Sequence, residues 1–157
     1  MSYNTQNYSE QGGSRWVVAG ELNIASGGYV SGGAVLNKRQ RFTIAEINAG
    51  ATLLPAIAGK SYRMIAAKVI AVGGAAGAVT TVDITGTVST SRKLVAFAQA
   101  NLTQSAVLVD GGTGGTVLAD GASHTANDAG TAILVGKTGA SVTTATHIDV
   151  IFDYVIE

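Results

Sequence analysis

The stretch Thr146-His-Ile-Asp-Val-Ile-Phe-Asp-Tyr-Val-Ile156 has the clearest two-residue periodicity in the sequence. One set of alternate positions is apolar or aromatic: Ile148, Val150, Phe152, Tyr154 and Ile156. The other set is more polar: His147, Asp149, Ile151, Asp153 and Val155. Because successive side chains of a strand point to opposite faces, we expect a half-buried strand here, with the apolar set facing the core.

Upstream of this stretch, Ser61 to Val72 is the strongest strand candidate. Tyr62 and Met64 alternate with Ile65 and Val69, so both faces are largely apolar. Such a strand is expected to lie centrally in its sheet, covered on both sides or lining a contact between subunits.

Shorter strand-like runs, separated by pairs of glycines, fill much of the remaining chain. They are Phe42 to Ile44 with Ile47 as a further member, Val79 to Thr87, Lys93 to Ala98, and Thr131 to Val135. Roughly eight or nine short strands without a long helical period predict an all-β sandwich, with the jelly roll as the expected type.

The connections between these runs are predicted from turn residues. Asn48-Ala49-Gly50 is expected to be a turn, and Ala98 to Gln104 a short helical segment. The glycine-rich run Asp110 to Thr116 predicts an exposed loop. Gly136-Lys137-Thr138-Gly139 is expected to join the last two strands.

Three regions are expected along the chain. Residues 1–14 are polar and predict a flexible, extended N-terminal arm. Residues 15–39 contain Ser26-Gly27-Gly28 and Ser31-Gly32-Gly33, which favour a glycine-rich β-hairpin or attachment segment over the start of a solenoid stalk. Residues 40–157 are expected to form the sandwich.

Composition restricts the classes of function. The chain has 157 residues, of which 46% are hydrophobic and only 13% charged, and ten basic residues balance ten acidic ones. This balance argues against a nucleic-acid partner. The most apolar stretch, Met64 to Val79, carries Lys68 and several glycines, so no membrane span is expected. The absence of Cys removes disulfides and thiolate ligands.

Reactive motifs are incomplete. Gly136-Lys137-Thr138 resembles the end of a phosphate-binding loop, but Gly130 is one residue too far away and the run between them is strand-like. His124 and His147 are the only histidines; His124 is expected to be a solvated loop residue and His147 to face solvent or a neighbour, and neither is expected to be a catalytic base. The sequence therefore predicts a protein that is not an enzyme and that has no cofactor.

Carboxylates give no clear metal site either. Asp110, Asp120 and Asp128 flank neighbouring loops but lack the spacing of a calcium loop, so turn formation is the favoured interpretation. Asp149 and Asp153 share a strand face about 13 Å apart, too far for a retaining glycosidase pair.

Association is expected from the few charges available to protect strand edges. We expect a homo-oligomer, with a trimer as the favoured state. Basic residues cluster at Lys38-Arg39-Gln40-Arg41 and at Arg92-Lys93. The candidate partner contacts are Trp16, Tyr29, Lys38, Arg39 and Arg41, with the basic group suited to an acidic surface.

Several runs resemble small all-β virion proteins of tailed bacteriophages, of the head decoration or cement type. They are Ala49-Gly-Ala-Thr-Leu-Leu-Pro-Ala-Ile-Ala-Gly-Lys-Ser-Tyr-Arg63, Ala71-Val-Gly-Gly74, Leu102-Thr-Gln-Ser-Ala-Val-Leu108, Leu118-Ala-Asp-Gly-Ala122 and Thr144-Ala-Thr-His-Ile-Asp-Val150. The resemblance implies a trimer made in the host cytoplasm and seated on the capsid surface, with the major capsid protein as partner.

Two other functions remain open at this stage. A phage tail fibre or baseplate component would use the Ser-Gly-Gly steps as the start of a stalk. A carbohydrate-binding module would need exposed aromatic faces, for which Trp16, Tyr29 and Tyr62 are the candidates.

Overall fold

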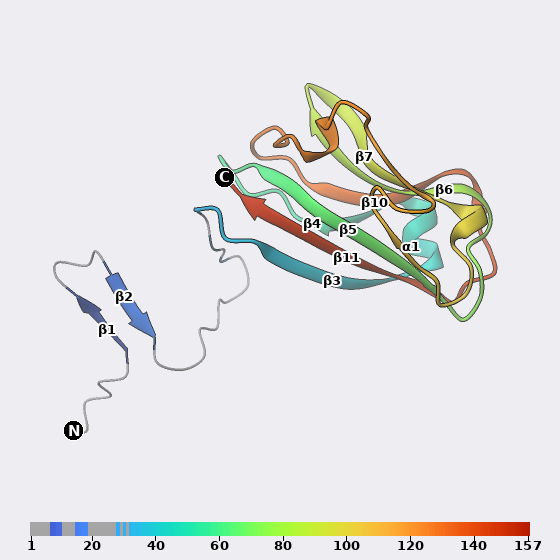
Figure 1. Ribbon diagram of the computed structural model, residues 1–157, viewed down its shortest axis with the longest axis horizontal. Coiled ribbons are helices and arrows are strands. Elements are labelled where there is room, and N and C mark those ends of the chain that lie inside the picture. The colour runs from blue at the N-terminus through green and yellow to red at the C-terminus, as the bar shows by residue number, and fades with distance from the viewer. Residues whose placement is uncertain (1–6, 11–14, 19–27, 29, 31) are drawn as a thin grey trace. The chain divides into compact units, whose positions relative to one another are not determined.

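The computed structural model describes residues 7–10, 15–18, 28, 30 and 32–157, which divide into two units (Figure 1). The first unit, Met1–Val30, contains the antiparallel strands β1 (Asn7–Glu10) and β2 (Arg15–Val18), with Glu10 opposite Arg15. Ser26, Gly27 and Ser31 of the two Ser-Gly-Gly steps lie outside the described residues. The second unit, Ser31–Glu157, holds the sandwich.

The sandwich consists of two antiparallel sheets. The four-stranded sheet has the order β3 (Leu36–Thr43), β11 (His147–Ile156), β5 (Tyr62–Val72) and β8 (Val107–Val109). The five-stranded sheet has the order β4 (Ala51–Leu54), β10 (Ile133–Val142), β6 (Gly77–Val88), β7 (Thr90–Ala98) and β9 (Gly115–Val117).

The strands pair in a nested order, β3 with β11, β4 with β10, β5 with β8 and β6 with β7. Alternate pairs enter the same sheet, because β11 also pairs with β5 and β10 also pairs with β6. This is the winding of a jelly roll, with β9 added beside β7. The expected all-β sandwich is confirmed.

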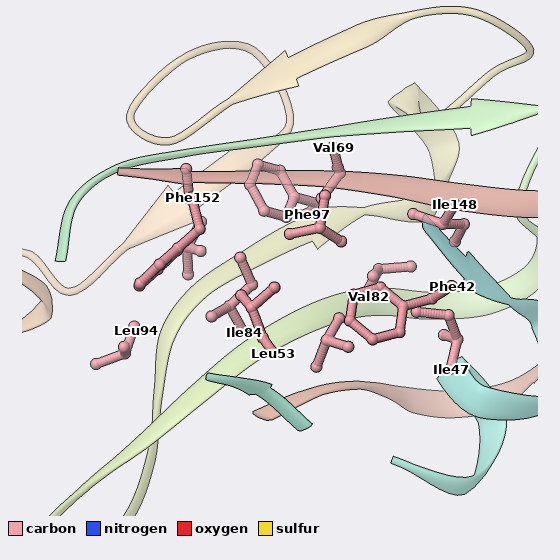
Figure 2. Packing of buried hydrophobic residues seen from close by; sticks show 14 of the residues in the cluster. Phe42, Ile47, Leu53, Val69, Val82, Ile84, Leu94, Phe97, Ile148 and Phe152 are labelled. Carbon is pink, nitrogen blue, oxygen red and sulfur yellow. The ribbon is translucent and has the colours of Figure 1, made fainter. Parts of the chain in front are cut away.

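The periodicity of β11 decides which of its side chains enter the core. Ile148, Val150 and Phe152 are fully buried. Figure 2 shows Ile148 and Phe152 on the side of β11 that faces residues of the five-stranded sheet such as Val82 and Ile84. Tyr154 stacks on Phe152 and packs edge-on against Tyr62. The predicted central position of Ser61 to Val72 is also confirmed, because β5 lies between β11 and β8.

The expected strand position of Ile47 is wrong. Ile44–Ala49 forms the helix α1, and Ile47 is fully buried on it. Thr43 begins the helix with a capping box, in which its side chain accepts from the Glu46 backbone N–H while Glu46 accepts from the Thr43 backbone N–H. Gly50 ends the helix at a φ of 81°.

The connection predicted at Gly136 to Gly139 is also wrong, because all four residues lie inside β10. The strand continues through a register shift between Thr138 and Gly139. Gly139 has a φ of 91°, and a Cβ there would lie 2.2 Å from Thr80 Oγ1. The glycine therefore permits an irregularity within the strand rather than a turn between strands.

Two further loop predictions have mixed outcomes. The helical segment expected within Ala98 to Gln104 is confirmed as the 3-10 turn η2 (Gln99–Asn101). The run Asp110 to Thr116 is only partly an exposed loop, because Gly115 and Thr116 belong to β9. A second 3-10 turn, η3 (Ala122–His124), precedes β10. None of the helices within the described ranges has the length and apolar character needed to cross a bilayer.

Candidate functional site: the charged outer face of the four-stranded sheet

Asp149 is the centre of an ion-pair cluster on the face of the four-stranded sheet that points away from the core. It lies on β11, opposite Arg41 of β3 in the strand register. Arg41 donates from Nε to Asp149 Oδ1 at 2.9 Å, and Arg39 donates from its guanidinium to Oδ2 at 3.2 Å. The Asp149 side chain is only 6% exposed, whereas those of Arg39 and Arg41 are 64% and 62% exposed.

The cluster holds Asp149 in its ionised form. The hydrogen bond from Arg41 is the main cause that lowers the pKa of Asp149, and Arg39 and the nearby His147 act in the same direction, against the effect of burial. The same hydrogen bond raises the pKa of Arg41. A carboxylate bound in this way is suited to organising the two guanidinium groups and poorly suited to accepting a proton.

His147 lies next to this carboxylate but is not paired with a nucleophile among the described residues. Its Nε2 is 3.8 Å from Asp149 Oδ1, is buried, and has no hydrogen-bond partner there. Thr43 is opposite His147 in the register, but its hydroxyl is bonded to Glu46 in the capping box. The other histidine, His124, has its Nδ1 3.4 Å from the backbone oxygen of Met64.

Apolar side chains continue the outer face toward the β8 edge. The register places Asp149 beside Ile70 and Ile70 beside Val107, and it places Val109 beside Lys68. Val107 and Val109 are 56% and 36% exposed. The face therefore changes from charged at β3 to apolar at β8.

The candidate contact residues do not form one group. Arg39 and Arg41 share the outer face, but Lys38 directly precedes Arg39 in the extended strand and therefore points to the opposite face. Trp16 lies in β2 of the N-terminal unit, and nothing of its side chain is described. Tyr29 lies outside the described residues. Sequence reasoning missed Asp149 as the partner of both arginines, because only the strand register brings residues 39, 41 and 149 together.

A second buried carboxylate, Asp83, lies on β6. Its Oδ2 forms an ion pair with Lys93 Nζ at 3.1 Å and accepts a hydrogen bond from the Thr138 hydroxyl at 2.6 Å. Lys93 also donates to Thr138 Oγ1 at 2.6 Å, so the amine is not placed to take the hydroxyl proton. One ion pair and one hydrogen bond thus reach Oδ2 of Asp83, which is 3% exposed, whereas its buried Oδ1 has no hydrogen-bond partner among the described residues.

A pocket of about 260 Å³ lies beside Asp83. Its walls come from the end of α1 and from β6 and β10, and they include Asn48, Gly50, Thr85 and Leu134. Gly136 and Lys137 line it from within an extended strand, so this segment lacks the loop-then-helix geometry of a phosphate-binding loop.

The three loop aspartates each accept a hydrogen bond from a backbone N–H. Asp110 accepts from Ala67, Asp120 from Ala122, and Asp128 from Ser89. Only the contact of Asp120, two residues from its donor, is the local bond expected of a turn-forming aspartate, whereas Asp110 and Asp128 bind backbone amides that are distant in the sequence. Over the part of the chain that the structure describes, no group of three or more acidic or histidine side chains could hold a metal ion.

Acid is expected to remove the stability that Asp149 contributes. Because its folded-state pKa is lowered, the contribution is complete above the unfolded-state pKa of about 4 and is lost as the pH falls through the folded-state value. Asp149→Asn should therefore reduce the free energy of unfolding by about 1 kcal/mol at pH 7. The free energy of unfolding of this variant should also decline less steeply between pH 5 and pH 2 than that of the unaltered protein. Denaturation measured across that pH range tests this.

Asp153→Asn is the matched control, because Asp153 lies on the same strand and accepts from the neutral Asn37 amide rather than from a guanidinium. A decline as steep in Asp149→Asn as in the unaltered protein would contradict the assigned role of the cluster.

Comparison with known proteins assigns the chain to no family: no family model, no curated protein and no solved structure matches it.

Proposed function

We propose that this chain is a structural protein of a tailed-phage virion, without enzymatic activity, which decorates the assembled head and stabilises it. The runs that resemble head decoration proteins support this proposal, and so does the jelly roll, an architecture that viral proteins use often. The partner is the major capsid protein, and the site of action is the capsid surface after synthesis in the host cytoplasm.

One observation carries most of the argument. The outer face of the four-stranded sheet offers an edge strand, two exposed arginines and exposed valines, while its buried carboxylate is occupied by ion pairs. Such a surface is suited to contacting other proteins, because exposed strand edges and apolar side chains favour association.

In the proposed mechanism, the protein bridges neighbouring subunits of the capsid lattice. A protein that binds only the assembled lattice stabilises that state by mass action. If copies associate as a trimer, several attachment points act together, and the effective concentration of the second and third contacts is high. The protein then needs no reaction chemistry to strengthen a shell.

The direct test is co-sedimentation of the protein with empty heads of a tailed phage, before and after the heads expand. The native mass of the protein in solution is measured alongside. We expect a trimer and saturable binding to one lattice state. A monomer that binds neither form of the head would reject the proposal. Electron microscopy of whole particles separates head decoration from a tail fibre or baseplate position.

Deleting Met1–Ser14 is expected to weaken head binding at least about tenfold, because losing one attachment point reduces avidity. The sandwich should stay folded, since Ser31–Glu157 is a separate compact unit with its own core. Circular dichroism and head co-sedimentation measure the two outcomes. A glycine-serine segment of equal length is the control for chain length, and unchanged occupancy would contradict an attachment role.

A carbohydrate-binding role has less support. Tyr62 is 3% exposed and its hydroxyl donates to the Pro55 backbone oxygen, so its ring offers no face to a sugar. A glycan array with full-length protein tests the remaining aromatic candidates.

A further inference from the structure

The free edge of β3 is the longest edge of the four-stranded sheet. β3 pairs with β11 along all eight residues from Leu36 to Thr43, and no other strand within the described ranges pairs with its second side. Figure 1 shows it as the outermost strand of its sheet. Eight extended residues span about 27 Å, so this edge has the length of a complete strand-binding site.

Charged side chains usually protect such an edge from added strands, but here two of the three basic side chains, those of Arg39 and Arg41, are bound to β11 instead. Asn37 donates to Asp153 at 2.5 Å, and Arg39 and Arg41 both donate to Asp149. Both acceptors lie on β11, so these side chains reach back across the sheet. The backbone of β3 is left without the protection that its sequence suggests.

The edge is nevertheless positively charged on both faces. β3 contains three basic residues and no acidic residue. On the outer face, Arg39 and Arg41 share the single carboxylate of Asp149 and keep most of their surface exposed. On the opposite face, Lys38 has no ion pair with any described residue.

We propose that the β3 edge binds an extended acidic segment of a partner protein by β-strand addition. Backbone hydrogen bonds to β3 would supply affinity. Carboxylates at alternate positions would reach Arg39 and Arg41 on one face, and a carboxylate at a neighbouring position would reach Lys38 on the other, so consecutive acidic residues match the edge. The inference rests on the proposed function for the identity of the partner, but its chemistry is tested without a phage head.

The probe is a capped eight-residue peptide, Val-Val-Glu-Glu-Glu-Glu-Val-Val, whose consecutive glutamates place carboxylates on both faces of an added strand, and it is added to the full-length protein. We expect saturable binding by titration calorimetry. We also expect slower hydrogen exchange at those β3 amides that do not bond to β11, measured by NMR. Protection confined to other strands, or no binding at low salt, would overturn the proposal and leave the head-binding test unaffected.

Control probes separate strand addition from attraction between charges. The same peptide with N-methylated backbone amides should bind at least about tenfold more weakly, because it cannot form the ladder. A peptide with lysine in place of glutamate should not bind. If the N-methylated peptide or a single-stranded oligonucleotide of equal charge protects β3 equally well, the proposal is wrong.

A variant of the protein tests whether the positive charge of β3 contributes to peptide binding. Lys38→Glu should weaken peptide binding about tenfold, because it replaces attraction by repulsion. Lys137→Glu is the matched control, since Lys137 lies on β10 of the other sheet and donates to the Gly139 backbone oxygen. Equal weakening by both variants would contradict a site at β3.

Discussion

Phe152→Ala is expected to lower the free energy of unfolding by about 3–5 kcal/mol, the range typical of removing a buried aromatic side chain. Phe152 is fully buried on β11, and its ring stacks on that of Tyr154 with the centroids 5.9 Å apart. The alanine variant leaves a cavity where side chains of the two sheets meet (Figure 2). Urea denaturation followed by circular dichroism measures the change.

Leu134→Ala is the matched control, because Leu134 is also a large apolar residue on a central strand but is 42% exposed. It should cost well under half as much as Phe152→Ala, since only part of its surface is removed from water on folding. Equal losses in the two variants would contradict the assigned core.

Asn127→Ala is expected to lower the free energy of unfolding by about 1–3 kcal/mol, because it removes the acceptor of the Thr87 backbone N–H and one of the two hydrogen bonds that Asn127 donates to the Tyr62 backbone oxygen. Asn127 is 3% exposed. Its Oδ1 accepts from the Thr87 backbone N–H at 2.8 Å, and its Nδ2 donates to the Tyr62 backbone oxygen at 3.0 Å. The side chain thus links the loop before β10 to strands of both sheets. Thermal denaturation measures the loss.

Gly86 provides the test of that geometry. A Cβ at residue 86 would lie 2.0 Å from Asn127 Oδ1, so Gly86→Ala should displace the amide and destabilise the protein on its own. In the Asn127→Ala background the same substitution should cost much less, because the obstructing atoms are gone. Additive losses in the double variant would show that the two residues do not interact as described.

The periodic strands were predictable because the alternation of apolar and polar residues indicates which side chains are buried. The alternation through β11 identifies Ile148, Val150 and Phe152 as core residues, and all three are buried. The apolar faces of β5 likewise indicated its central position. Where a residue's role depends on one face of a regular strand, the sequence contains the necessary information.

The errors occurred where local chemistry opposes a simple reading of apolar and turn residues. The Thr43 and Glu46 pair is a helix-start signal, and it outweighs the strand-like character of Ile44 and Ile47. Gly136 and Gly139 were expected in a turn because glycine marks turns, yet β10 includes both. Glycine permits an irregular strand as readily as a turn, so composition alone does not separate the two.

The candidate surface was predictable only in part. The basic group around Arg39 is visible in the sequence, but the direction of its side chains is not. That direction depends on Asp149, which is 108 residues from Arg41 along the chain.

The sequence by itself therefore determined the class of fold, because alternation of apolar side chains expresses which face of each strand leaves water. The tertiary structure alone decided how the strands are ordered and which charges meet, since pairing between distant strands depends on their register. It also decided that both arginines of β3 are held by β11, because the register places Asp149 opposite Arg41 and within reach of Arg39.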